Sequence, residues 1–186
     1  MSYFGFTFNN RHSDEFHVIM KSIDRTVLPS KRKEAYTIPG RDGNYYDRTE
    51  TDYNERQISV TISFRGEQQS LLSLRARIRE IAKWLSADSA PLIFDDEPDK
   101  AYIASVDAGL SLEQLAAWGQ CSLTFTCQPF AESVQYITET KDITASNDSM
   151  TVQVNGTQDT PCILTIKNTG TTNITGITIQ RKAGRA

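Results

Sequence analysis

The stretch QISVTISFRG, residues 57–66, gives the clearest indication of how this chain folds. Large apolar side chains at the even positions alternate with Ser and Thr at the odd positions, which predicts a strand with one buried face. The segment CSLTFTCQPF, residues 121–130, repeats the alternation. The residues expected to point inward are Ile58, Val60, Ile62, Phe64, Cys121, Leu123, Phe125 and Cys127.

Between these two strands the hydrophobic period changes from two to three and four. In SLLSLRARIREIAKWLS, residues 70–86, this spacing predicts one helix that packs on a sheet. Trp84 lies beside the apolar stripe and is expected to pack at the margin of the core or at a subunit contact, with the core favoured. The stripe consists of Leu71, Leu74, Ile78, Ile81 and Leu85, and a basic row on the solvent side consists of Arg75, Arg79 and Lys83.

The elements define the expected fold class and domains. A mainly β fold is predicted, in which residues 1–133 form an N-terminal β-sandwich with this main helix and a short second helix at 111–119. Residues 134–186 are rich in Thr, Asn, Ser and Gly and predict further strands. Because a free-standing sandwich needs about 100 residues, this part is expected to be an incomplete C-terminal β-sandwich domain. Its strand-like pieces are MTVQVNG (150–156), PCILTIKNTG (161–170) and ITGITIQ (174–180).

Composition excludes several classes of protein. With 38% hydrophobic and 23% charged residues, the chain has the profile of a globular protein. No apolar run approaches the roughly 20 residues that cross a bilayer, and the N-terminus lacks the features of a signal peptide. We therefore expect synthesis and assembly in a cytoplasm. The net charge of −3 argues against general nucleic-acid binding, and the three cysteines show no CxxC spacing.

The acidic stretch LIFDDEPDKAYIA, residues 92–104, is the first candidate for chemistry. A calcium loop would spread its ligands over about twelve residues with a central glycine, and a glycosidase would place its two carboxylates on separate elements. Here four acids lie in a short segment between two predicted strands, where Asp and Pro favour a turn. We therefore expect a solvent-facing hairpin tip at 95–99 without a bound metal. The acids are Asp95, Asp96, Glu97 and Asp99.

No catalytic constellation is evident elsewhere in the sequence. His12 and His17, the two histidines, are five positions apart in a strand-like region and are expected to be ordinary surface or edge residues. The nucleophile-elbow, zinc-protease, P-loop and dinucleotide-binding motifs are absent from the sequence. We therefore predict that the protein is not an enzyme and needs no cofactor or metal.

Three segments in order resemble the distal tail protein family of long, flexible-tailed phages and prophages, particularly those of Gram-positive hosts. They are LPSKRKEAYTIPGRDGNY (28–45), ISVTISFRG followed by RIREIAKWLS (58–86), and PLIFDDEPDKAYIASV (91–106). The segment LTFTCQPFAES (123–133) resembles the end of that family's N-terminal domain. The resemblance covers about residues 1–133; the rest resembles the family's C-terminal sandwich only weakly.

The resemblance implies a structural component of the virion tail rather than an enzyme. Members of the family form hexameric rings that join the tail tube to the tail-associated hub and the receptor-binding apparatus. The tube, hub and receptor-binding proteins are therefore the implied partners, together with further copies of this chain. An acidic lumen would let DNA pass through such a ring without sticking.

The polar excursion at 39–57 is the candidate subunit interface. It contains Arg41, Asp42, Tyr45, Tyr46 and Tyr53, and Tyr and Arg are enriched among the residues that dominate interface energies. Sheet pairing and loop exchange between subunits, closed by cyclic symmetry, would build the ring.

Two other function classes compete with this interpretation. The first is a carbohydrate-binding module for host adhesion in the C-terminal part. It is weakened because 134–186 contains no Trp and Tyr136 is its only aromatic residue. The second is a hydrolase that uses the acidic stretch, for which Asp95→Asn would abolish an activity.

Overall fold

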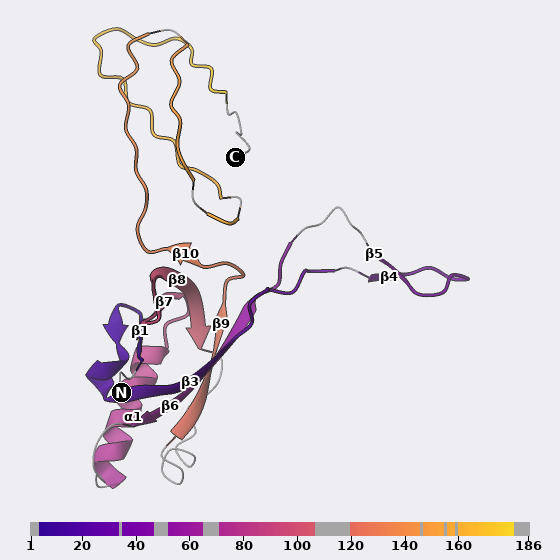
Figure 1. Ribbon diagram of the computed structural model, residues 1–186, viewed down its shortest axis with the longest axis vertical. Coiled ribbons are helices and arrows are strands. Elements are labelled where there is room, and N and C mark those ends of the chain that lie inside the picture. The colour runs from indigo at the N-terminus through magenta and orange to yellow at the C-terminus, as the bar shows by residue number, and fades with distance from the viewer. Residues whose placement is uncertain are drawn as a thin grey trace. The chain divides into compact units, whose positions relative to one another are not determined.

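The chain divides into two compact units, Met1–Ile137 and Thr138–Ala186 (Figure 1). The computed structural model describes residues 4–33, 35–46, 52–64, 71–106, 120–145, 147–154, 156–158 and 160–180. The predicted short helix at 111–119 lies outside these residues. Among the described helices, none has the length and apolar character needed to cross a membrane.

The first unit is built on one antiparallel sheet with the strand order β2-β1-β7-β8-β9-β6-β3, and β10 pairs with β8. A 3-10 turn, η1 (Ser13–Phe16), joins β2 to β3, and one helix, α1 (Leu71–Leu85), precedes β7. The predicted mainly β fold with a packed helix is confirmed, and it is consistent with a β-sandwich. The strands are β1 (Phe6–Phe8), β2 (Arg11–His12), β3 (Val18–Arg25), β6 (Arg56–Phe64), β7 (Ala90–Phe94), β8 (Glu97–Val106), β9 (Gln120–Cys127) and β10 (Glu132–Ser133).

The two strands expected from alternation, β6 and β9, are neighbours in this sheet and lie between β8 and the end strand β3. Ile58 pairs with Phe125 and Val60 with Leu123, and all four side chains are fully buried. The prediction that every serine of β6 faces solvent is wrong for Ser63, which is buried. Ser63 pairs directly with buried Ile19 of β3, so both faces of the sheet are covered at this end. Phe64, expected inside, is half-buried.

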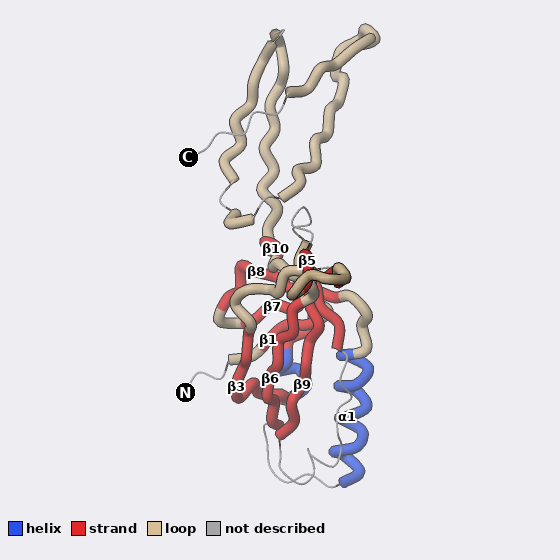
Figure 2. The backbone as a smooth tube through the Cα atoms, turned by 90° about the vertical axis from the view of Figure 1, so that its right-hand side faces the viewer, coloured by secondary structure: helices blue, strands red, loops and turns tan. Residues whose placement is uncertain are grey.

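Helix α1 packs the described part of its predicted stripe into the core, whereas the side chains of Leu71 and Leu74 lie outside the described part of the structure. Figure 2 shows α1 lying along one side of the strands of the first unit. Ile78, Ile81 and Leu85 are buried, and Trp84 is buried with them in the core. The Trp84 ring stacks on Phe16 of η1 at 4.3 Å, and its indole N–H donates to the Phe8 carbonyl at 2.7 Å. A single tryptophan therefore ties the helix to β1 and to the 3-10 turn.

The second unit differs from expectation. Its described residues contain no assigned strand, although Figure 2 shows them as long extended loops. The strands predicted at 150–156, 161–170 and 174–180 are therefore not confirmed. Their apolar side chains are largely open to solvent, and Ile163 is 95% exposed. Alternation in a sequence indicates which way side chains point, but a strand also needs a hydrogen-bonded neighbour and a layer that covers its apolar face.

The three cysteines are free and provide a test of the core. Burial raises the pKa of the Cys127 thiol to about 12, although the positive charge of the nearby Arg56 guanidinium acts to lower it. Cys121 is also buried, whereas Cys162 is exposed. We expect iodoacetamide to label Cys162 alone in the native protein and all three thiols after unfolding, as measured by intact mass.

The same burial predicts an alkaline limit to stability. A raised pKa in the folded state means that the protonated Cys127 thiol is stabilising below the ordinary pKa of 9.0. This contribution is lost as the pH rises from there toward the folded pKa. The melting temperature of the wild type should therefore fall more steeply above pH 9.0 than that of Cys127→Ser, which has no thiol to ionise. Identical pH profiles of the melting temperature for the two proteins would contradict this assignment.

Candidate functional site: an exposed arm

Residues 26–55, which connect β3 to β6, form an arm with a stalk and a tip. The stalk is a short antiparallel ladder. Arg32 N–H donates to the Asp52 carbonyl, and Asn54 N–H donates to the Ser30 carbonyl, each at 2.8 Å. Lys31 and Tyr53 form the bridge between these two hydrogen bonds. Within the described residues 26–33, 35–46 and 52–55, the base of this polar excursion is therefore held by its own backbone pairing.

The tip is a hairpin of β4 (Ala35–Thr37) and β5 (Asn44–Tyr46). Gly40 and Gly43 both have φ of +78°, a left-handed conformation that glycine adopts without steric cost. These two glycines follow Pro39 and Asp42, and Pro-Gly and Asp-Gly are dipeptides that favour turns. Every residue of both strands is exposed, so the tip makes a two-stranded ribbon without a covering layer among the described residues.

Aromatic side chains cover both faces of the tip. Tyr36 and Tyr45 are directly opposite each other and share one face, and Tyr46 lies on the other. A cation sits near a ring on each face: Arg41 is 5.9 Å from the Tyr45 centroid and Lys33 is 5.8 Å from that of Tyr46. These three tyrosines are 45–50% exposed. An exposed ribbon of this size is marginal in water by itself, and its aromatic and cationic composition is typical of an interface.

Two arginines hold the ends of the arm to the first unit. Arg25, the last residue of β3, places its guanidinium 4.3 Å from the Phe94 centroid and forms ion pairs with Asp96 and Glu97. β3 is at one end of the strand order and β7 lies several strands away, so these contacts show that the sheet curves back on itself. The hairpin between β7 and β8 thereby fixes where the arm begins.

Arg56, the first residue of β6, fixes where the arm ends. Its guanidinium lies 5.7 Å from the Tyr102 centroid and donates to the Val27 carbonyl at 3.3 Å. The Tyr102 hydroxyl in turn donates to Glu97 at 3.3 Å. Burial raises the pKa of Tyr102, and the Glu97 carboxylate raises it further, while Arg56 and Arg25 act in the opposite direction. The phenol therefore stays protonated and remains a donor to Glu97.

The residues expected at an interface fall into two groups. Arg41, Tyr45 and Tyr46 meet at the tip, and Asp42 lies in its loop. Tyr53 belongs to the stalk instead, where it is half-buried and packs edge-on against Phe130 at 5.0 Å. Its contacts are those of an anchor for the arm. A shallow hollow beside it is lined by Arg32, Tyr53, Asn54, Glu55, Gln57 and Thr126.

The acidic stretch forms the turn between β7 and β8, as a hairpin was expected to do. The tip is shorter than predicted, because Phe94 pairs with Glu97 and only Asp95 and Asp96 make the turn. Asp95 and Asp96 are exposed, as expected for the tip. The acids of this turn also form ion pairs with His12 and Arg25, which come from other parts of the chain. Within the described residues, no cluster of His, Cys, Asp and Glu has the grouping of a metal site.

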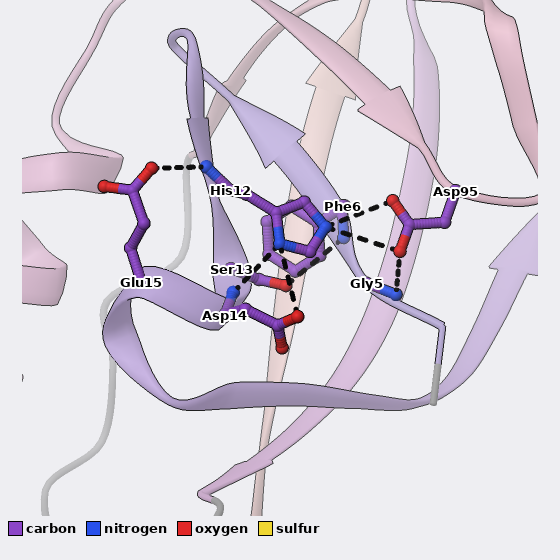
Figure 3. A network of polar contacts seen from close by, with 7 residues as sticks. All are labelled: Gly5, Phe6, His12, Ser13, Asp14, Glu15 and Asp95. Atoms are coloured by element: carbon purple, nitrogen blue, oxygen red, sulfur yellow. Dashed lines mark hydrogen bonds and ion pairs between the residues drawn. The ribbon is translucent and has the colours of Figure 1, made fainter. Parts of the chain in front are cut away.

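Asp95 and His12 join this turn to the N-terminal strands (Figure 3). The Asp95 carboxylate accepts the Gly5 N–H at 2.7 Å and lies 3.2 Å from His12 Nε2. A Cβ on Gly5 would come within 2.8 Å of the His12 ring, so this close approach requires glycine. The sequence predicted a surface or edge residue, and His12 does lie in the end strand β2. The sequence did not predict that its ring bridges two segments.

His12 also begins the 3-10 turn. Its Nδ1 accepts the Asp14 N–H at 3.2 Å, and the Glu15 carboxylate accepts the His12 N–H at 3.2 Å, which completes a capping box (Figure 3). A hydrogen bond from Arg11, followed by that from the His12 backbone, lowers the pKa of Glu15. Sequence reasoning missed this turn, because the capping-box signature is a Ser or Thr three positions before a Glu, and here the cap is a histidine.

Comparison with known proteins supplies the context for this geometry. Residues 13–127 match the family model described as the phage tail protein RIFT-related domain. The chain belongs to this family. The match covers the sheet from η1 to β9 together with the whole arm. Family membership makes the protein a component of a phage tail, and the family resemblance found in the sequence is confirmed.

A solved structure has a similar fold. The crystal structure of the SPP1 Dit (gp 19.1) protein, presented as a paradigm of the hub adsorption apparatus in phages that infect Gram-positive bacteria, matches with a TM-score of 0.56 and 20% sequence identity. The match covers 68% of this chain and 50% of the SPP1 protein, so this chain corresponds to half of its length. No curated protein sequence matches the chain significantly.

Proposed function

We propose that this protein is a ring-forming subunit at the tip of a phage tail. Six copies would form a ring that joins the tail tube to the hub and the receptor-binding apparatus. The observation that carries this proposal is the arm, whose exposed aromatic tip is held in place at its base by Arg25 and Arg56. Family membership indicates a phage tail protein, and the arm is the surface through which one subunit would contact the next.

The strand order supports assembly by pairing between copies. Among the described strands, β2 and β3 lie at the two ends of the main sheet, and both strands of the tip have an open edge. Open edges present unpaired backbone groups that a neighbouring chain can satisfy. A repeated contact between two different surfaces closes into a ring when the rotation is cyclic. A structural role accounts for the exposed arm and for the two arginines at its base.

The arm tip provides the direct test. We expect Tyr45→Ser with Tyr46→Ser to weaken self-association at least tenfold in sedimentation velocity, because buried tyrosines at protein interfaces each contribute about 1–2 kcal/mol or more. Both side chains are about half exposed, so the thermal midpoint of the subunit should not change. Tyr136→Ser is the matched control, since Tyr136 is 88% exposed and lies outside the arm.

Equal self-association of the arm variant and the Tyr136→Ser control would exclude the tip as the contact. A fall in the thermal midpoint of the arm variant would instead show that the tip packs within its own subunit.

A further inference from the structure

Helix α1 carries a row of cations that the fold does not use. Arg75, Arg79 and Lys83 are exposed at successive intervals of four residues and span about 12 Å along the helix axis. None of them forms an ion pair with a described residue. Glu80 is the only acid in the helix, so the row is a concentrated positive surface on a chain whose net charge is −3.

The turn between β7 and β8 carries the opposite charge. Four acids lie at 95–99, and within the described residues only Arg25 and Lys100 pair with Asp96, Glu97 and Asp99. Asp99 remains the most accessible, with 71% of its side chain exposed. Asp96 lies in the turn itself and Asp99 in the first part of β8, so the acids form one compact acidic surface.

These two surfaces belong to the same unit but do not meet within it. Figures 1 and 2 show α1 and the turn between β7 and β8 toward opposite ends of the first unit. A basic surface at one end and an acidic surface at the other are complementary only between different copies. A contact of this kind is head-to-tail, which is the arrangement that a ring requires.

We propose that the α1 row Arg75, Arg79 and Lys83 binds the acidic turn at 95–99 of a second copy of this chain. The proposal rests on the proposed ring, for which it names a second contact besides the arm. Exposed ion pairs contribute only about 0.2–1 kcal/mol each, so their role is to select the head-to-tail register and to speed encounter rather than to supply most of the affinity. The contact must therefore weaken as salt rises.

A charge-reversal cycle tests the contact. The four proteins are wild type, Lys83→Glu, Asp99→Lys and the combined variant, with association constants from sedimentation velocity at low salt. Each single reversal should weaken association about fivefold, and the combined variant should return to within about twofold of wild type. Lys167→Glu, an exposed reversal in the second unit, is the control and should leave the constant unchanged.

The outcomes separate this contact from the ring itself. Hexamers that form normally while the two reversals act additively would overturn the α1 contact and leave the ring intact. A wild-type chain that stays monomeric at every concentration would overturn both. Wild-type binding to a short DNA duplex that Lys83→Glu abolishes would overturn the proposal in favour of a nucleic-acid surface. The α1 contact is supported only if the combined variant recovers the association constant that each single reversal lowers.

Discussion

Replacement of Trp84 by alanine should lower the free energy of unfolding by about 4 kcal/mol, the range found for large aromatic side chains in cores. Trp84 stacks on Phe16 at 4.3 Å and on Phe6 at 5.5 Å, and it contacts Phe8 edge-on. Its removal would leave a cavity between α1, β1 and η1 and deprive the Phe8 carbonyl of its donor. Urea denaturation followed by circular dichroism measures the change.

The Trp84→Phe variant separates packing from hydrogen bonding. Phenylalanine keeps much of the stack on Phe16 but has no N–H for the Phe8 carbonyl, which is buried with the ring. The cost should therefore be about 1–3 kcal/mol, below that of alanine. Equal costs for the two variants would contradict a role for the stack, and a cost below about 1 kcal/mol for alanine would contradict the buried position of the ring.

The second large effect is expected at the base of the arm. Arg25→Ala should lower the free energy of unfolding by about 2 kcal/mol, because it removes the cation over Phe94 and leaves Asp96 and Glu97 to repel each other. This value is reduced from that of a fully buried ion pair, since 21% of the Arg25 side chain is exposed. Arg25→Lys should recover only part of it, because an ammonium cannot pair with two acids and stack on a ring as a guanidinium does.

Loss of Arg25 should also loosen the arm. Hydrogen exchange at the stalk amides of Arg32 and Asn54 should accelerate in Arg25→Ala, since the arm then begins from an unanchored strand end. Arg41→Ala is the matched control, because among the described residues its guanidinium lies over the exposed ring of Tyr45 at the tip and makes no ion pair. An Arg25→Ala protein with wild-type stability and exchange would contradict the anchoring role.

Sequence periodicity predicted the local elements of the first unit well. The alternation in β6 and β9 and the stripe of α1 each record which side faces the core, and the buried Ile58, Phe125 and Ile81 follow from them. The contacts that shape the site join residues far apart in the chain, such as Arg25 with Asp96 and His12 with Asp95. Such pairs depend on how the sheet curves, which no local pattern encodes.

The acidic turn illustrates this difference. Its composition correctly predicted a hairpin, because Asp and Pro favour turns whatever surrounds them. Its contacts with other parts of the chain depend on the strand order, which brings Gly5, just before β1, and Arg25, at the end of β3, to the same turn. The arm shows the same limit: its glycines marked turns, whereas the stalk ladder between 30–32 and 52–54 required the fold.

Native mass spectrometry of the intact chain across a range of concentrations tests the central claim most directly. The account predicts a species of about six times the 20.9 kDa chain mass that grows with concentration and is lost in Tyr45→Ser with Tyr46→Ser. A wild-type protein that remains at 20.9 kDa throughout, or an arm variant that assembles as readily as wild type, would contradict it.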